Sequence, residues 1–212
     1  MPTSISTLPG PTGPFETGTE AGRPTLRVHL WNPAKPVESV IFEVMPSITE
    51  TGQANYRDLQ PAQSPGGFSV YTGSALRQFS LTDVRLLART EREAQEKLRI
   101  QNLIRGWTKP YFGKGNSASE TGLPPDVLLF SAYGHQNISR IPVVIGSYNI
   151  EYPNDSDYLY LARTAGGTPI TDASATPISS VISLNLQEVR SMRELNGFDL
   201  QKYKEGNLVD WR

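Results

Sequence analysis

Two segments of this chain alternate strictly between apolar and polar residues, and this alternation constrains the fold more than any other feature. VISLNLQEV begins at Val181, and SYNIEY begins at Ser147. Because successive side chains of a strand point to opposite faces, each segment has one apolar face and one polar face. This pattern is typical of an antiparallel sheet with one buried face. The polar faces consist of Ser183, Asn185 and Gln187 in the first segment and of Ser147, Asn149 and Glu151 in the second.

Other short β-rich runs are separated by clusters of Gly, Pro, Asn and Asp, which indicates a mainly β protein. Long polar connections are expected at residues 115–125 and 162–177. We see no internal repeat and no domain boundary after residue 24, so residues 25–212 are expected to form a single β domain. The expected strands are 27–31, 39–51, 68–71, 77–87, 126–133, 141–152 and 181–190.

One amphipathic helix is expected at about residues 91–105. Thr90 and Glu93 have the spacing of a capping box, with Thr90 as the N-cap. Gly106 and Pro110 end the pattern. We therefore expect the helix to lay one face on the sheet, and we expect a short C-terminal helix within residues 198–205. The apolar stripe consists of Ile100, Leu103, Ile104 and Trp107.

Composition limits what the chain can do. Residues 1–24 are rich in Gly and Pro and poor in large apolar residues, so a flexible arm that orders on a neighbour is expected there. The chain has no cysteine, which excludes disulfides and thiolate chemistry. Twenty basic and 21 acidic residues give a net charge of −1, so no strong field attracts nucleic acid. No apolar run approaches the ~20 residues of a membrane span, and we expect a soluble, unexported chain without a membrane anchor.

The segment YPNDSDY, which starts at Tyr152, is the most suggestive candidate for a chemical site. Asp155 and Asp157 are spaced to share a cation, but a calcium loop starting at Asp155 would need Gly and Glu where Tyr160 and Gly166 stand. No partner base for acid/base catalysis is recognisable. Asn, Asp and Ser are also typical of tight turns, so a structural turn is the favoured interpretation.

No other motif indicates catalysis. His29 and His135 are the only histidines, and a hydrogen-bonded structural role is favoured for both. The Phe112–Gly115 segment lacks the spacing of a phosphate loop. Two groups of aromatic residues remain, one at the end of the expected helix and one directly after the two aspartates. For the second group we consider contact with another subunit or stacking on a carbohydrate. We therefore expect no enzyme, metal or cofactor. The aromatic groups are Trp107, Tyr111 and Phe112, and Tyr158 and Tyr160.

Three segments, taken in order, resemble a known family. They are residues 66–113, which contain RGWTKPYFG, residues 141–159, which contain YPNDSDY, and residues 182–208, which contain FDLQKYKEG. Together they are similar to the tube-initiator group of baseplate tail-tube proteins from contractile-tailed bacteriophages. The likeness extends over about residues 37–211 and leaves out the Gly/Pro-rich arm.

The resemblance implies an antiparallel β-sandwich or barrel of tail-tube type with a flanking helix, and a six-fold ring of identical subunits in the virion. It implies a hub protein on one side and another tube-initiator or major tube protein on the other, with assembly in the host cytoplasm. The lumen of such a ring passes the tape-measure protein and then DNA. Turn or inter-subunit contact candidates are Asp155, Asp157, Tyr158, Trp107 and Tyr111. Two alternatives remain open: a β-sandwich glycan-binding module that uses Tyr158 and Tyr160, and a metal-assisted hydrolase centred on Asp155 and Asp157.

Overall fold

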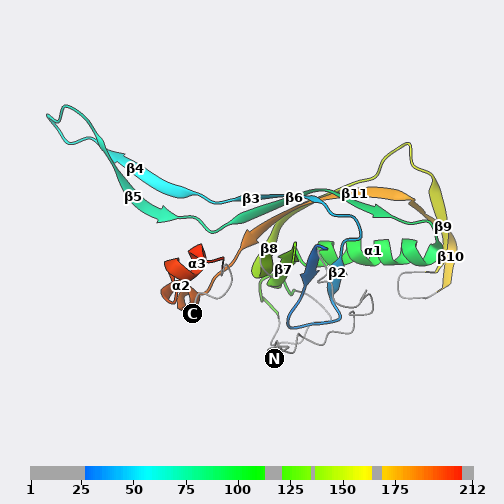
Figure 1. Cartoon of the computed structure of the whole chain (residues 1–212). Coiled ribbons are helices and arrows are strands. Elements are labelled where there is room, and N and C mark those ends of the chain that lie inside the picture. The colour runs from blue at the N-terminus through cyan, green and yellow to red at the C-terminus, as the bar shows by residue number, and fades with distance from the viewer. Residues whose placement is uncertain (1–26, 113–120, 135–136, 164–168, 207–212) are drawn as a thin grey trace, which may run out of the picture.

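The structure is a computed structural model that describes residues 27–112, 121–134, 137–163 and 169–206 (Figure 1). The fold is mainly β with a flanking helix, as the alternation predicts. The strands are β1 (His29–Trp31), β2 (Ser39–Ile41), β3 (Ser47–Thr51), β4 (Ala54–Leu59), β5 (Phe68–Ser74), β6 (Gln78–Leu87), β7 (Leu128–Ala132), β8 (Ile138–Glu151), β9 (Tyr158–Arg163), β10 (Pro169–Pro177) and β11 (Ser179–Glu188). The helices are α1 (Glu91–Gly106), α2 (Met192–Asn196) and α3 (Leu200–Lys204).

Seven strands form one antiparallel sheet in the order β2-β1-β7-β8-β11-β6-β3, so the free edges of this sheet are β2 and β3. At the centre, β11 pairs with β8 on one side and with β6 on the other. Two pairs of strands, β4 with β5 and β9 with β10, form separate two-stranded sheets.

The core lies between one face of the large sheet and α1 (Figure 1). Ile182, Leu184 and Leu186 of β11 are at most 1% exposed, which confirms the alternation predicted for this strand. Ile104 and Trp107 of α1 are also buried. The apolar stripe of the helix therefore contacts the apolar face of the sheet, as expected.

The start of α1 confirms Thr90 as the N-cap, because the Thr90 side chain accepts a hydrogen bond from the Glu93 amide at 3.3 Å. The reciprocal bond differs from the expected capping box. The Glu93 carboxylate accepts from the amide of Arg89 at 2.7 Å, one residue before the cap. Both bonds satisfy amides near the helix start, where no carbonyl of the preceding turn is available.

The N-terminal half of α1 packs against β9 and β10, where Ala94 and Leu161 belong to a second small apolar cluster. The Ala162 amide donates to Glu91 Oε1 at 2.9 Å. Lys97 is only 2% exposed, and its Nζ donates to the carbonyl oxygen of Pro177. A charged group is therefore buried at this junction, and burial lowers the pKa of Lys97 to about 8.

Strands β4 and β5 form a hairpin that extends away from the rest of the protein (Figure 1). The pairing of β3 with β6 ends at Thr51 and Gln78, and the pairing of β4 with β5 begins at Ala54 and Ser74. Apart from a half-buried Gly73, every residue of β4 and β5 is exposed. The hairpin thus lies outside the core.

Two short helices follow β11. The structure confirms a helix within 198–205, because α3 spans Leu200–Lys204 with Asp199 as its N-cap. Helix α2 was not predicted, although it begins with a capping box between Ser191 and Glu194. Neither helix contributes a buried residue.

The sequence-based prediction was wrong at several places. Residues 169–177 are not a polar connection but strand β10, which pairs with β9. Strands β4 and β9 were also missed, and the run 39–51 is split into β2 and β3. The predicted arm at 1–24, His135 and most of the 115–125 connection lie outside the described residues. Within the part of the chain that the structure describes, no helix is long and apolar enough to cross a membrane.

His29 departs from the hydrogen-bonded role expected for it. Its ring stacks on Trp31 with centroids 4.4 Å apart. Its Nε2 is buried and finds no hydrogen-bond partner among the described residues. Burial lowers the pKa of His29, because the charged imidazolium would lose its hydration.

Candidate functional site

Trp107 and Tyr111, two of the residues singled out in the sequence, line a surface pocket of about 560 Å³ at the C-terminal end of α1. Trp107 is 3% exposed and belongs to the core, and its Nε1 donates to Glu38 at 3.1 Å. Tyr111 lies at the rim and is half-buried. The structure therefore brings the two aromatic residues together, but it leaves little of Trp107 for a partner to contact.

The polar groups of this pocket bond to one another. The Tyr111 hydroxyl donates to Asp126 at 2.5 Å and accepts from Lys35 at 2.6 Å. Burial and the bond to Asp126 raise the pKa of Tyr111. The hydrogen bond to Tyr111 raises the pKa of Lys35. Because each charged group faces a partner, this cluster ties the β1–β2 connection to the residues after α1, and we assign it no catalytic role.

Asp155 and Asp157 lie in the turn between β8 and β9, as the turn interpretation predicted. Both are exposed, and no described residue contacts their carboxylates through a hydrogen bond or ion pair. The turn is held by its neighbours instead, since Ile178 donates its amide to the Asp157 carbonyl at 2.7 Å and Ser179 donates its amide to the Ser156 hydroxyl at 3.1 Å. Among the described residues, no group of three or more His, Asp or Glu side chains is arranged to hold a metal ion.

Tyr158 and Tyr160 stand two residues apart on β9, and so they share one face of that strand. Their exposed fractions are 58% and 81%. Leu159 and Leu161 point the other way, toward α1. The two tyrosines are therefore available to a ligand or a neighbouring chain.

The β4–β5 hairpin carries the largest set of exposed apolar side chains that the structure describes. Sequence reasoning predicted a strand at 68–71 within β5 but neither β4 nor the hairpin. On one face Tyr56 pairs with Tyr71, and their rings meet edge to face at 5.6 Å. On the other face Leu59 pairs with Phe68, next to Val70. The exposed fractions are 65% for Tyr56, 54% for Tyr71 and Phe68, and 39% for Leu59 and Val70.

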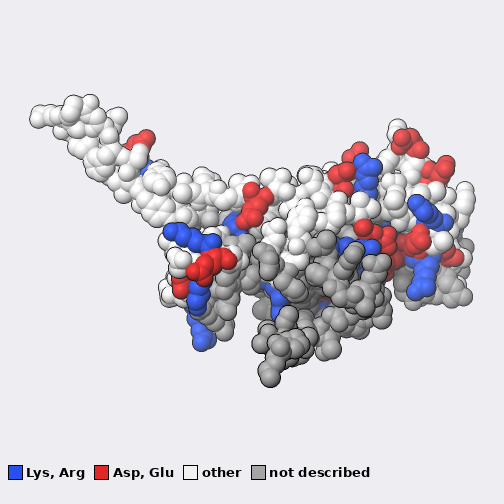
Figure 2. Space-filling model, in the orientation of Figure 1, with Lys and Arg blue, Asp and Glu red and all other residues white. Residues whose placement is uncertain are grey.

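Charge is nearly absent from the hairpin. Between Gly52 and Leu76 the charged residues are Arg57 and Asp58. Figure 2 shows the hairpin as an almost uncharged surface, whereas acidic and basic residues gather over other parts of the protein. An apolar, uncharged surface of this kind marks a contact site more often than a solvated arm. The signal in the sequence was the turn-forming SPGG, Ser64–Gly67, directly before the β-prone run FSVY.

The sheet face opposite α1 has a different character, because neutral polar side chains line most of it. Charged side chains stand at one end, where Arg85 and Glu151 both pair with Val181 and Arg85 contacts Asp83. Cross-strand pairing sets Asn185 beside Ser147 and Ser80, and Ser183 beside Asn149. Asn185 Nδ2 donates to Ser147 Oγ at 2.8 Å. The polar residues predicted on two separate strands therefore share one surface, which β6 and β3 extend. Its hydroxyl and amide residues are Ser47, Thr49, Thr51, Gln78, Ser80, Thr82, Ser147, Asn149, Ser183, Asn185 and Gln187.

No model of a known protein family matches this chain, and no curated protein matches it. The hairpin, the polar sheet face and the exposed tyrosines are the surfaces of the described residues that are available to partners.

Proposed function

We propose that the protein is a structural ring subunit of a phage contractile-tail baseplate tube, a tube initiator that joins a central hub to the tail tube. The observation that carries the proposal is the β4–β5 hairpin, which leaves the core and exposes apolar side chains on both faces. An isolated two-stranded hairpin is marginally stable in water. Such an arm gains stability when it lies on another chain, which is what a subunit of a larger assembly requires.

The length of the arm supports the same conclusion. Residues 52–76 form the hairpin and its connections to β3 and β6. A standard interface takes roughly 20–30 residues from each partner, so this segment alone supplies the amount of surface that a stable contact needs. An arm that contacts a different patch on the next copy makes a head-to-tail interface, and such interfaces close into rings when the rotation allows.

The neutral face of the sheet supports the second half of the proposal, a conduit for the tape-measure protein and DNA. Lys and Arg side chains attract phosphates, and each contact that they make slows a sliding strand. The hydroxyl and amide surface around Asn185 and Ser147 is uncharged, and Arg85 at its end is paired with Asp83 at 3.0 Å. A lumen formed by this face offers a passing polyanion few cations without a partner.

The proposal is tested by electron microscopy of the purified protein, alone and mixed with candidate hub and tube partners. We expect six-fold rings in at least one of these mixtures. Phe68→Ser, on the hairpin, is expected to abolish the rings, whereas the matched control Phe112→Ser is expected to keep them, although Phe112 is 80% exposed. The absence of any six-fold assembly in every mixture would overturn the proposal.

Tyr158 and Tyr160 favour a second candidate, a glycan-binding module, because two exposed tyrosines on one strand face can stack on a sugar. Binding on a glycan array that is lost in Tyr158→Ala and in Tyr160→Ala would support this candidate. Loss of glycan binding in these variants with the rings intact would favour the glycan-binding module, whereas loss of the rings in Tyr158→Ala without any glycan binding by the native protein would identify Tyr158 as a subunit contact.

A further inference from the structure

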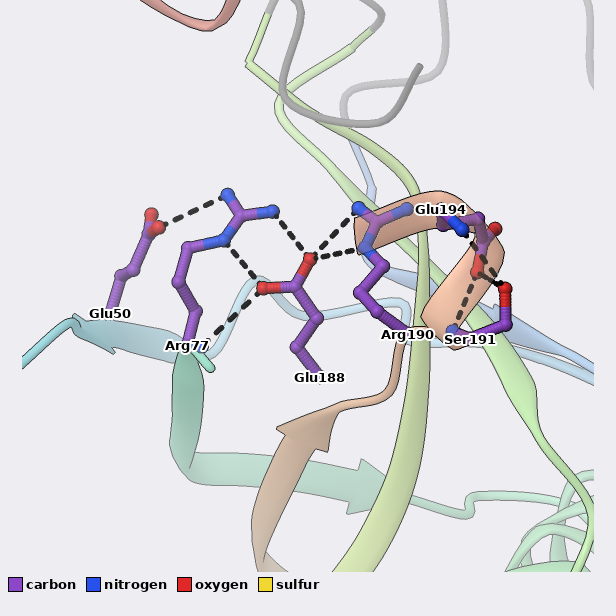
Figure 3. A network of polar contacts seen from close by, with 6 residues as sticks. All are labelled: Glu50, Arg77, Glu188, Arg190, Ser191 and Glu194. Atoms are coloured by element: carbon purple, nitrogen blue, oxygen red, sulfur yellow. Dashed lines mark hydrogen bonds and ion pairs between the residues drawn. The ribbon is translucent and has the colours of Figure 1, made fainter. Parts of the chain in front are cut away.

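A cluster of buried charges lies where the hairpin leaves the sheet. Arg77 directly precedes β6, and its guanidinium donates from Nε to Glu188 Oε2 at 2.8 Å and from Nη2 to Glu188 Oε1 at 3.0 Å. Arg190 Nε donates to the same Glu188 Oε1 at 2.8 Å. Figure 3 shows the Glu188 carboxylate between the two guanidinium groups. Arg77, Glu188 and Arg190 are 6%, 1% and 9% exposed.

The cluster holds both strands that continue into the hairpin. Arg77 Nη1 reaches Glu50 on β3 at 3.3 Å, while the Arg77 backbone carbonyl accepts from the Glu188 amide at 2.9 Å. Beyond this point the strand ladder is interrupted, and the hydrogen bond from the Ala75 amide to the Gln53 carbonyl bridges the gap at 2.8 Å. The direction of the hairpin is therefore determined at the residues that Glu188 and Arg77 fix.

The same cluster also reaches the C-terminal helices. Arg190 directly precedes Ser191, the N-cap of α2. The Arg77 guanidinium lies 5.8 Å from the ring centre of Tyr203 on α3. Among the described residues, neither α2 nor α3 contributes a buried side chain. The contact between Arg77 and Tyr203 links α3 to the cluster, and Arg190 leads directly into the N-cap of α2.

The charges can stay buried because they satisfy one another. Burial alone would raise the pKa of Glu188, but the hydrogen bonds and charges of Arg77 and Arg190 outweigh burial and hold that pKa below its usual value. A forked guanidinium that binds a carboxylate through two parallel bonds also fixes the angle between the two side chains. The arrangement thus fixes direction as well as distance.

We propose that the Arg77–Glu188–Arg190 cluster is a rigid joint that sets the direction of the β4–β5 hairpin and the position of the α2–α3 helix pair together. The three residues are positioning residues. The joint acts within one chain, so this inference stands or falls separately from the proposed ring.

The experiment measures distances between pairs of spin labels, which the absence of cysteine in the native chain makes selective. One pair joins Ala62→Cys, in the exposed hairpin turn, to Arg92→Cys, on the exposed side of α1. The second pair joins Met192→Cys, at the start of α2, to Arg92→Cys. Both distance distributions are expected to be narrow in the otherwise native chain.

Glu188→Gln keeps the shape of the side chain but replaces one acceptor oxygen with an amide donor that faces a guanidinium, so both distributions are expected to broaden about twofold. The matched control is Glu151→Gln, the same change at an exposed position of β8, which is expected to leave both unchanged. Arg77→Lys keeps the positive charge but loses the planar guanidinium that donates two parallel hydrogen bonds. The same two distances are measured in this variant if Glu188→Gln does not fold. Distance distributions as narrow as the native ones in a folded variant would contradict the proposal that the cluster is a rigid joint. Broadening of one distribution without the other would contradict it as well.

Discussion

The buried lysine of α1 makes a quantitative prediction about stability and pH. Lys97 is 2% exposed, and its Nζ donates to the Pro177 carbonyl, with no carboxylate partner among the described residues. Burial lowers its pKa from 10.5 to about 8. Because each tenfold change in the protonation equilibrium corresponds to about 1.4 kcal/mol, the folded state bears a cost of about 3 kcal/mol while this lysine is charged.

The direction in which stability changes with pH depends on whether the folded or the unfolded chain releases the Lys97 proton first. Below pH 8, Lys97 is charged in both the folded and the unfolded chain, and the folded state bears the full cost. Between pH 8 and 10.5 the folded chain loses the proton first, so the unfolded chain binds more protons and the free energy of unfolding rises with pH. Roughly 2.5 kcal/mol of the cost should disappear between pH 7 and 10.

Lys97→Met isolates this contribution, because methionine fills similar space without a charge. Urea unfolding followed by circular dichroism gives the free energy of unfolding of both proteins at each pH. We expect the native protein to gain about 2.5 kcal/mol relative to Lys97→Met from pH 7 to 10. The lost bond to the Pro177 carbonyl lowers the stability of the variant by about 1–3 kcal/mol at every pH, and so it does not change the slope.

The control is Lys109→Met, since Lys109 is exposed. Its stability relative to the native protein should stay constant over the same pH range. A difference between native and Lys97→Met proteins that is flat from pH 7 to 10 would refute the reasoning, because it would mean that Lys97 keeps its hydration in the folded state.

Three further predictions concern stability and binding. Ile104→Ala, which removes a fully buried side chain, should lower the free energy of unfolding by about 2–5 kcal/mol in urea, whereas Leu123→Ala, at an exposed position, should change it by less than about 0.5 kcal/mol. Thr90→Ala should lower the free energy of unfolding by about 1 kcal/mol because it removes the N-cap of α1, whereas Thr90→Ser should keep the native stability. Equal stability of the native protein and both variants would contradict the capping role. Asp155→Asn and Asp157→Asn should each leave the unfolding free energy within about 0.5 kcal/mol, and calorimetry should detect no divalent-ion binding to the native chain; binding lost in either variant would restore the metal hypothesis.

Local patterns in the sequence predicted the local structure well. The span of α1 follows from Thr90 and the apolar stripe that ends at Trp107, and both signals lie within a few residues of the structure they specify. The polar and apolar faces of β11 follow from alternation in the same way. In both cases the residues of the buried face recur at a regular spacing in the sequence.

The hairpin was missed in part: the strand predicted at 68–71 belongs to β5, but β4 was not predicted. Strand β4, ANYRDL, has no buried face, so no apolar period marks it as a strand. Strand β9, YLYLAR, was missed for another reason: Leu159 and Leu161 pack toward α1, but Tyr158 and Tyr160 occupy the other face, so no apolar–polar alternation marks the strand. Elements that pack outside the core of their own chain leave a weaker pattern, and here those elements include the assembly surface we propose.

The charged cluster was beyond sequence reasoning because it depends on register. Arg77 and Glu188 are 111 residues apart and meet because β6 and β11 pair through Gln78 and Gln187. A shift of one residue would carry either side chain to the other face of the sheet. The pocket bonds among Lys35, Tyr111 and Asp126 depend on tertiary structure in the same way.

The geometry of the hairpin explains why a rigid joint matters for an arm of this kind. About ten residues separate Gln53 from the turn at Gln63, so at ~3.3 Å per residue the tip lies roughly 30 Å from the joint. A change of about 10° at the joint then moves the tip by about 5 Å, which is the spacing between neighbouring strands. The displacement is smaller nearer the base, but Phe68, which pairs with Leu59, lies roughly 20 Å from the joint and would still move by about 3.5 Å, away from any site shaped to receive it. A hairpin that contacts other chains through side chains near its tip therefore needs its direction fixed at the base, and the bidentate Arg77–Glu188 pair lies at the point where the smallest change in angle has the largest effect.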